Sequence, residues 1–317
     1  MNFYSKLKRF IDKSRNTPAR VEDIYQYLRT EKIGYDLKDP KVITGRLLAT
    51  LNNTKKEIKS LEEVEFQVFS QWGDDGIIQY LISNLQIENK TFIEFGVENY
   101  TESNTRFLVI NNNWTGYIID GSEKNIQYIK NDPISWAHEL FAKAQFITKE
   151  NINSLLSEFL ERGYSNEIGL LSIDIDGNDY WVWKEISVIN PIIVIVEYNS
   201  VFGSDKFWTI PYSANYYRLS EDNTILYFGA SLGAFCNLAE EKGYYFVGCN
   251  IAGNNAYFIR KDKIGSFTPL TCNEGFVSSK FREMQLENGE RVSGEERIKY
   301  LKGRKVINTK TNELELI

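Results

Sequence analysis

Two short acidic stretches of the chain carry the residue types that could do chemistry. Asp174 and Asp176 follow the apolar run 170–173, and Glu197 follows the apolar run 192–196. Alternation along a strand sends the side chains of Asp174 and Asp176 to the same face. Carboxylates are costly to bury unless a positive group lies beside them. We therefore expect a ligand ammonium group, a divalent metal, or both, at this place.

The oxygen atoms of Asp176, Glu197 and Asn199 form a candidate metal site. The uninterrupted apolar run 192–196 is typical of a strand buried on both faces of a parallel sheet. Its end would lie beside that of the Asp174 strand, and hard oxygen ligands suit Mg²⁺ or Mn²⁺. The alternative is that Asp174 or Asp176 binds the amine of a cofactor, while Glu197 hydrogen-bonds the acceptor substrate.

Residues 91–123 would position a cofactor. A short strand over Phe92–Phe95 is followed by Gly96, a polar turn and a helix, and a second strand over Tyr117–Ile119 ends at Asp120. This order of strand, turn, helix, strand and acid is the first half of a nucleotide-binding α/β unit. The ligand of such a unit lies beyond the carboxyl ends of the strands, and Asp120 is the residue expected to bind ribose hydroxyls.

The turn after the first strand is acidic where a dinucleotide-binding turn has glycines. Gly96 stands alone, with Glu98 and Tyr100 two and four residues on. Together with Glu94 and Glu102, Glu98 would repel the pyrophosphate of a dinucleotide, which binds bare backbone at a helix N-terminus. The same carboxylates tolerate S-adenosylmethionine, which carries an ammonium and a sulfonium group and has no phosphate. The sign of the charge therefore favours this methyl donor.

On these residues the sequence resembles the class I S-adenosylmethionine-dependent methyltransferases. The resemblance covers roughly Phe66–Arg260, and it is closest to the FkbM-like and macrocin O-methyltransferase-like enzymes of bacterial surface-polysaccharide biosynthesis. It implies an α/β fold with a doubly wound, mostly parallel seven-stranded sheet. It also implies methyl transfer to a sugar hydroxyl, of a nucleotide-linked or surface-polysaccharide sugar. Macrocin-type relatives bind a divalent metal with further acids where this chain has Glu197-Tyr198-Asn199.

The resemblance also nominates residues for the cofactor. The element Ser-Gln-x-Gly-x-Asp-Gly at 70–76 is similar to one that precedes the cofactor loop in the FkbM-like relatives. It nominates Gln71 and Asp75 for the cofactor or acceptor pocket, and the alternative is that they form a polar helix cap. A third strand, expected over 144–147, would bring Ile147 to the adenine. The predicted cofactor-binding residues are Gln71, Glu94, Gly96, Asn104, Asp120, Gly121, Ile147 and Asp174.

Transfer to a hydroxyl requires removal of a proton by a close general base or a metal that lowers the hydroxyl's pKa. Asp176 and Asp179 are the favoured candidates for this base. The single histidine, His138, is a third candidate, although it precedes the third strand in an expected helix. FkbM-like sequences place a histidine two residues after the strand-end acid, where this chain has Asn178.

Composition excludes some partners and compartments. The net charge of −6 argues against nucleic acid as a partner, because phosphate binding needs a basic surface. The three cysteines, in no Cys-x-x-Cys spacing, predict neither a disulfide framework nor a zinc site and fit a reducing cytosol. The absence of a signal peptide and of a long apolar run predicts a cytoplasmic protein with no transmembrane segment. The expected partner is a small sugar or sugar-nucleotide acceptor.

The chain is expected to have three parts: an N-terminal helical appendage (1–65), a methyltransferase domain (66–262) and a C-terminal extension (263–317). Residues 1–15 are basic and amphipathic. The favoured interpretation is a helix packed on its own domain or on a second subunit of a homodimer, and the alternative is contact with an anionic membrane surface. The aromatic, proline-broken connection 202–218 is expected to be a lid or an acceptor platform.

Two other functions remain open at this stage. An NAD-dependent sugar-nucleotide oxidoreductase could use a similar sheet, but the missing glycines disfavour it. A catalytically degenerate methyltransferase fold could serve as a binding subunit, and Glu98 and Tyr100 in the cofactor loop would favour it.

Overall fold

The computed structural model describes residues 39–55, 57–218, 225–279, 284–285, 289 and 291–317. The chain divides into two compact units, residues 1–44 and 45–317. Only 39–44 of the first unit are described, and they include the first residues of α3 (Pro40–Asn52). The basic segment 1–15 and most of the expected helical appendage lie outside the described residues.

The elements of the second unit alternate between strands and helices through its first two thirds. The strands are β1 (Thr91–Phe95), β2 (Thr115–Asp120), β3 (Leu140–Ala144), β4 (Leu170–Ile173), β5 (Ile193–Glu197), β6 (Trp208–Thr209), β7 (Tyr244–Cys249), β8 (Asn255–Arg260), β9 (Met284–Gln285), β10 (Arg291–Val292), β11 (Lys305–Asn308) and β12 (Leu314–Leu316). The α-helices are α4 (Asp74–Asn84), α5 (Arg106–Asn112), α6 (Glu123–Asn131), α7 (Ile134–Ala137), α8 (Ile152–Leu160), α9 (Asp179–Glu185), α11 (Leu232–Lys242) and α12 (Cys272–Gly275). The short 3₁₀ helices are η1 (Leu61–Val64), η2 (Ser200–Phe202), η3 (Lys261–Lys263) and η4 (Gly294–Leu301).

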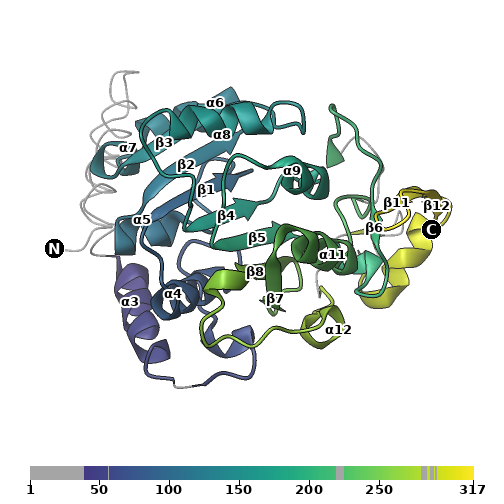
Figure 1. Cartoon of the computed structure of the whole chain (residues 1–317), viewed down its shortest axis with the longest axis horizontal. Helices are drawn as coiled ribbons and strands as arrows, with labels where there is room; N and C mark the ends of the chain where they lie inside the picture. Colours follow the sequence, from purple (N-terminus) through teal and green to yellow (C-terminus); the bar gives the residue numbers. More distant parts are fainter. Residues whose placement is uncertain (1–38, 56, 219–224, 280–283, 286–288, 290) are drawn as a thin grey trace, which may run out of the picture. The chain divides into compact units, whose positions relative to one another are not determined.

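The central sheet has seven strands in the order β3-β2-β1-β4-β5-β8-β7 (Figure 1). Strands β3, β2, β1, β4 and β5 pair in parallel, whereas β8 is antiparallel to both of its neighbours. The order reverses between β1 and β4. This arrangement confirms the predicted α/β class and the mostly parallel, doubly wound seven-stranded sheet.

Alternation along the central strands divides their side chains between two faces. Ile93, Ile173 and Val196 belong to the large core that also contains residues of α8, α9 and α11. Their neighbours Glu94, Asp174 and Glu197 point to the opposite face, since successive strand side chains alternate. Right-handed crossovers place α5, which joins β1 to β2, on the opposite face from α9, which joins β4 to β5. The three acids therefore share the face that α5 covers, near the carboxyl ends of the strands.

The third strand lies earlier in the chain than expected. It was predicted over 144–147, but β3 spans Leu140–Ala144 and its ladder with β2 ends at the pair Asp120–Ala144. As an edge strand, β3 is only partly buried and includes Lys143, so it lacks the apolar pattern of the inner strands. Ile147 lies beyond the strand and packs in the large core.

The C-terminal residues are joined to the connection that follows β5. Strand β11 pairs with β12 on one side and with β6 on the other (Figure 1). A second small core combines side chains from this connection with side chains near the C-terminus: Phe202, Ile210, Tyr216, Leu226, Tyr227, Val292, Leu301 and Val306. The C-terminal extension thus packs against the aromatic connection. The sequence pattern did not predict this contact.

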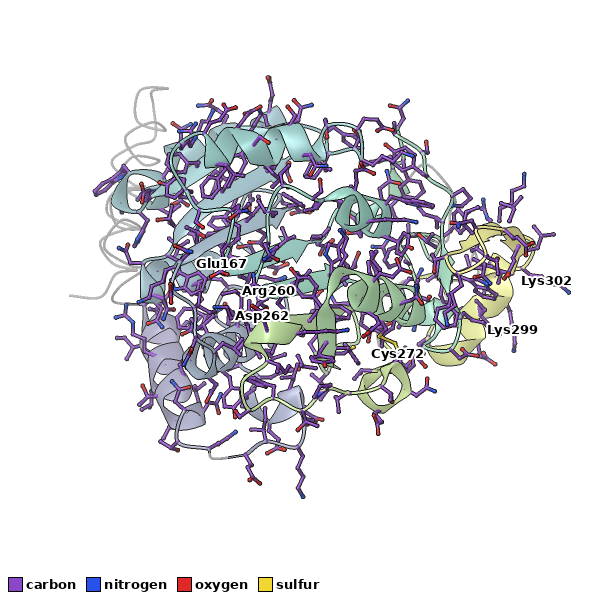
Figure 2. All side chains as sticks on the ribbon, viewed as in Figure 1. Glu167, Arg260, Asp262, Cys272, Lys299 and Lys302 are labelled. Atoms are coloured by element: carbon purple, nitrogen blue, oxygen red, sulfur yellow. A yellow bond between two sulfur atoms is a disulfide. The ribbon has the colours of Figure 1, made fainter. Side chains whose placement is uncertain are left out.

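A disulfide joins Cys236 of α11 to Cys272 of α12 (Figure 2), which corrects the expectation of no disulfide. The spacing rule failed because 36 residues separate the two cysteines, so their proximity depends on how α11 and α12 pack. Cys249 is a free, buried cysteine. No helix in the described part of the chain is both long and apolar enough to cross a membrane.

Candidate active site

A cavity of about 560 Å³ lies at the carboxyl ends of β1, β4 and β5, beside the point where the strand order reverses. Ligands of open α/β sheets bind at such a switch point. The described residues that line it are Gln71, Trp72, Glu94, Gly96, Val97, Glu98, Glu102, Ser103, Asn104, Asp174, Asp176, Glu197, Tyr217, Arg218, Ile225, Asn254 and Asn255. Acidic side chains dominate this lining, and Arg218 is its one cation among the described residues.

The loop after β1 begins with a glycine that no other residue could replace without strain. Gly96 has φ +71°, and a Cβ built on it would overlap the backbone oxygen of Asp174. Its N–H donates to the carbonyl of Ile119 at 3.0 Å, which joins the loop to β2. Glu98 and Tyr100 also have positive φ, 48° and 63°. Such conformations cost energy in non-glycine residues and cluster at functional sites.

Glu94 holds this loop by hydrogen bonds to its far end. Its carboxylate accepts from the N–H of Asn104 at 2.9 Å, from the N–H of Thr105 at 3.2 Å and from the Thr105 hydroxyl. Burial raises the pKa of Glu94 to about 7, although these hydrogen bonds oppose the shift. The side chain of Asn104 donates to the Ser172 hydroxyl at 3.2 Å. Both predicted cofactor residues therefore line the cavity and also shape it.

Asp120 closes the other side of the loop. Its Oδ2 accepts from the N–H of Glu98 at 2.8 Å, and its Oδ1 accepts from the N–H of Ser122 at 2.8 Å and from Asn125 Nδ2 at 3.1 Å. Asp120 does not line the cavity itself, but Glu98, which it holds, does. Gly121 follows Asp120 in the chain and is likewise absent from the cavity lining. A Cβ built on it would lie 3.3 Å from the ring of Phe146.

Asp179 is a structural residue of the turn between β4 and α9. It is fully buried, and its two carboxylate oxygens accept from the N–H groups of Ile175 at 2.9 Å and Gly177 at 2.8 Å. Burial raises its pKa to about 6, against the effect of these hydrogen bonds. Because both oxygens are engaged and the side chain lies outside the cavity lining, the geometry does not support the predicted role as general base.

Three carboxylates meet at the ends of β4 and β5. Asp174, Asp176 and Glu197 each offer one oxygen atom, and these atoms lie within 4.8 Å of one another. Asp176 has φ +58°, which directs the chain sharply away from β4. Its side chain is the exposed member of the group, at 64%, whereas that of Glu197 is 12% exposed. The structure thus brings together the two strand-end acids and Glu197, as predicted.

Arg218 neutralises part of this charge. Its Nη1 lies 2.7 Å from Asp176 Oδ1 and 3.8 Å from Glu197 Oε1. The guanidinium lies 3.5 Å from the centre of the Phe228 ring. Burial, and then the neighbouring acids, raise the pKa of Asp174 and Glu197 well above their usual range, and Arg218 opposes this. The group therefore favours binding of a proton or of a further cation.

Like Asp120, Gly121 and Asp179, three further predicted site residues lie outside the cavity lining. Asn199 is buried and donates to the carbonyls of Leu226 and Phe228, so it anchors the segment that precedes α11. His138 follows α7 at the amino end of β3, where its Nδ1 lies 2.8 Å from Asn113 Oδ1. Ile147 contributes to the core. The predictions of Asn199 as a metal ligand, His138 as a base and Ile147 as an adenine contact are not supported by these positions.

The cavity also contains residues that sequence reasoning missed. Gln71 was predicted, and its neighbour Trp72 lines the cavity beside it, 38% exposed. Tyr217, 59% exposed, comes from the aromatic connection. Arg218 follows it, and Asn255 begins β8. The aromatic content of 202–218 was a signal for Tyr217, whereas nothing in the local pattern indicated Arg218 or Asn255.

In comparisons by sequence, no protein-family model and no curated protein matches the chain. Similar solved structures include the N-terminal domain of EvdMO1 with SAH bound, at 8% identity, TM-score 0.37, covering 68% of this chain and 94% of that one. An S-adenosylmethionine-dependent methyltransferase from Clostridium acetobutylicum has 10% identity, TM-score 0.36 and coverages of 59% and 90%. An O-methyltransferase from Bacillus cereus in complex with SAH has 10% identity, TM-score 0.33 and coverages of 70% and 90%. Likenesses of this size assign the chain to no family.

Proposed function

We propose that this protein is an S-adenosylmethionine-dependent O-methyltransferase whose acceptor is a sugar hydroxyl, of a nucleotide-linked or surface-polysaccharide sugar. The observation that carries the proposal is the acid-lined cavity at the switch point of the sheet. Its carboxylates are Glu94, Glu98, Glu102, Asp174, Asp176 and Glu197. A ligand bound there must bring positive charge, and the ammonium and sulfonium groups of S-adenosylmethionine supply it.

The same lining disfavours a dinucleotide. A pyrophosphate beyond β1 would meet Glu94, Glu98 and Glu102, and among the described lining residues only Arg218 could balance its charge. Arg218 already lies 2.7 Å from Asp176. The electrostatics of the cavity therefore favour the methyl donor over NAD.

In this proposal the loop after β1 binds the donor, and the acids after β4 and β5 serve the acceptor. Bound S-adenosylmethionine would supply an electrophilic methyl group, so the protein's task is to align an acceptor hydroxyl and take up its proton. Asp176 is the residue we assign to the proton, because its carboxylate is the exposed member of the acidic group. Asp174 and Glu197 are the less exposed members of the same group, and each offers an oxygen within 4.8 Å of the others.

The sugar acceptor is supported by two aromatic rings at the cavity. Trp72 and Tyr217 both line it and both remain partly exposed. An aromatic ring with a polar edge offers an apolar face to a sugar ring and a hydrogen bond to its hydroxyls. The connection that carries Tyr217 is held by the C-terminal strands, which suggests a fixed platform for the acceptor.

We also propose a divalent cation, Mg²⁺ or Mn²⁺, at Asp174, Asp176 and Glu197. Carboxylate oxygens are the ligands that these ions prefer. The Glu197 Oε2 atom is buried and has no hydrogen-bond partner among the described residues, which is costly unless a ligand meets it. Such an ion would lower the pKa of an acceptor hydroxyl.

Calorimetry tests the donor directly. We expect the purified chain to bind S-adenosylmethionine and its demethylated product at micromolar concentrations, and to bind NAD at least a hundredfold more weakly. Methyl transfer from a radiolabelled donor to sugar nucleotides then tests the acceptor class. If neither S-adenosylmethionine nor its demethylated product binds at millimolar concentrations, the proposal is wrong. If S-adenosylmethionine binds but no methyl group is transferred to any acceptor, the result favours a binding subunit.

Three broader expectations remain part of the proposal. The first is the division into residues 1–65, 66–262 and 263–317. The two compact units of the structure instead divide between residues 44 and 45. The C-terminal residues also share a small core with the connection after β5. The others are a homodimer and a cytoplasmic location. The Cys236–Cys272 disulfide is more usual in oxidising compartments, so thiol alkylation in intact cells tests the location.

A further inference from the structure

Glu197 and Asn255 face each other directly in the ladder between β5 and β8. Opposed residues of an antiparallel pair project to the same face of the sheet, with their Cβ atoms about 5 Å apart. Both residues line the acidic cavity. Each also ends in a buried oxygen, Glu197 Oε2 and Asn255 Oδ1, that has no hydrogen-bond partner in the described part of the chain. Two side chains that each carry an unsatisfied acceptor are therefore directly opposed on the same face of the sheet.

The orientation of the Asn255 amide follows from its other contact. Its Nδ2 donates to Asp74 Oδ1 at 2.9 Å, and Asn255 itself is 4% exposed. Asp74 is fully buried and also accepts from Tyr257 Oη and Asn250 Nδ2. Turning the Asn255 amide over would place its oxygen against the Asp74 carboxylate. The network below the sheet edge therefore holds the amide nitrogen at Asp74 and leaves Oδ1 for the cavity.

The amide oxygen of Asn255 can only accept, and a carboxylate oxygen of Glu197 can only accept unless a proton binds to it. This pair therefore requires a proton, a cation or a ligand with several donors. The adjoining acids Asp174 and Asp176 extend the same oxygen-rich surface. A neutral amide oxygen adds a ligand to such a set without adding a further negative charge, and amide carbonyls are regular ligands of hard divalent ions. A carboxylate that orients a ligating side chain from behind is the usual outer partner in metal sites.

We propose that Asn255 is the fourth protein ligand of a divalent cation held by Asp174, Asp176 and Glu197, and that Asp74 is the residue that positions it. The inference rests on the cation site of the proposed function. It replaces the amide of Asn199, which the sequence suggested, with one from the neighbouring antiparallel strand. The metal site then joins β4, β5 and β8, so a cation would also tie the antiparallel strand to the parallel part of the sheet.

The experiment measures Mn²⁺ binding to the full-length protein without methyl donor, by loss of the free Mn²⁺ electron paramagnetic resonance signal. We expect Asn255→Ala to raise the dissociation constant at least tenfold, the scale reported for groups around metal sites. Gln79→Ala is the matched control. Gln79 is a buried amide on α4 that bonds Asn111 and Asn112 and lies outside the cavity lining, so we expect a change below twofold. Asn255→Ser, which keeps a hydroxyl donor for Asp74, gives the same measurement if the alanine variant does not fold.

The outcomes separate this inference from the proposed function. Equal Mn²⁺ affinity in the wild type and both Asn255 variants overturns it, and a change only in the KM for a sugar acceptor would assign Asn255 to the acceptor instead. If the wild type binds the demethylated donor but no Mn²⁺, the inference fails while the methyltransferase proposal stands. If it binds neither, both fail.

Discussion

Gly96 lies against the backbone carbonyl of Asp174, so the loop after β1 and the turn after β4 meet where no side chain fits. We predict that Gly96→Ala destabilises the fold and abolishes donor binding. The left-handed φ alone costs an alanine about 1–2 kcal/mol, and the overlap with backbone adds to this. Gly163→Ala is the control, because Gly163 also has positive φ but no atom of the described residues within 4 Å of the built Cβ. Urea unfolding that shows equal losses in both variants would contradict the close approach.

Arg218 occupies the position of a counter-ion to the acidic group, so it should compete with a metal. We predict that Arg218→Met tightens Mn²⁺ binding on the order of tenfold, because a charge-assisted hydrogen bond to Asp176 no longer has to be broken. Lys143→Met removes a cation that pairs with Glu158 outside the cavity and should leave the affinity unchanged. Weaker binding in Arg218→Met would mean that Arg218 supports the site and does not compete with the metal.

Asp179 and Asp176 should respond differently to the same substitution. Asp179→Asn places an NH₂ group against the backbone N–H of Ile175 or Gly177, so we expect a loss of about 1–3 kcal/mol in unfolding free energy. Asp176→Asn changes an exposed side chain, and asparagine tolerates its positive φ. We therefore expect stability within about 1 kcal/mol of the wild type and loss of methyl transfer. Chemical denaturation and the transfer assay check both, and full activity in Asp176→Asn would refute its role as base.

Stability should fall as the pH rises through the range in which Glu65 titrates. Burial is the main cause that raises the pKa of Glu65 to about 7, although its hydrogen bond from the N–H of Ile251 opposes this. The folded state binds the proton of the Glu65 carboxyl more tightly than the unfolded state does. The free energy of unfolding therefore falls as the pH rises from about 4.5 to about 7. Glu65→Gln should reduce this slope in the melting temperature. An unchanged slope in Glu65→Gln would contradict the assignment.

The disulfide between α11 and α12 closes a loop across a sequence separation of 36 residues. Breaking it in Cys236→Ser should lower the unfolding free energy by about 2–4 kcal/mol. Thiol titration of the unreduced, denatured protein should find one thiol, that of Cys249, and three after reduction. Three thiols before reduction would show that the pair is reduced in the purified protein.

The sequence alone determined the sheet and the edge at which its chemistry lies. Short apolar runs that end in an acid predict buried strands, and parallel strands bring such ends to one edge, so Glu94, Asp174 and Glu197 could be placed together from local pattern. The same local reasoning placed the third strand four residues late, because the edge strand β3 is only partly buried and carries Lys143.

Tertiary structure alone decided which polar residues serve the site and which serve the fold. Asp179 and Asn199 have the right types and positions in sequence, yet backbone groups occupy their oxygens or amides. Arg218 and Asn255 reach the cavity from segments distant in sequence. A hydrogen bond depends on where a partner lies in space to within a few tenths of an ångström, whereas sequence spacing specifies only which face of a strand or helix a residue occupies.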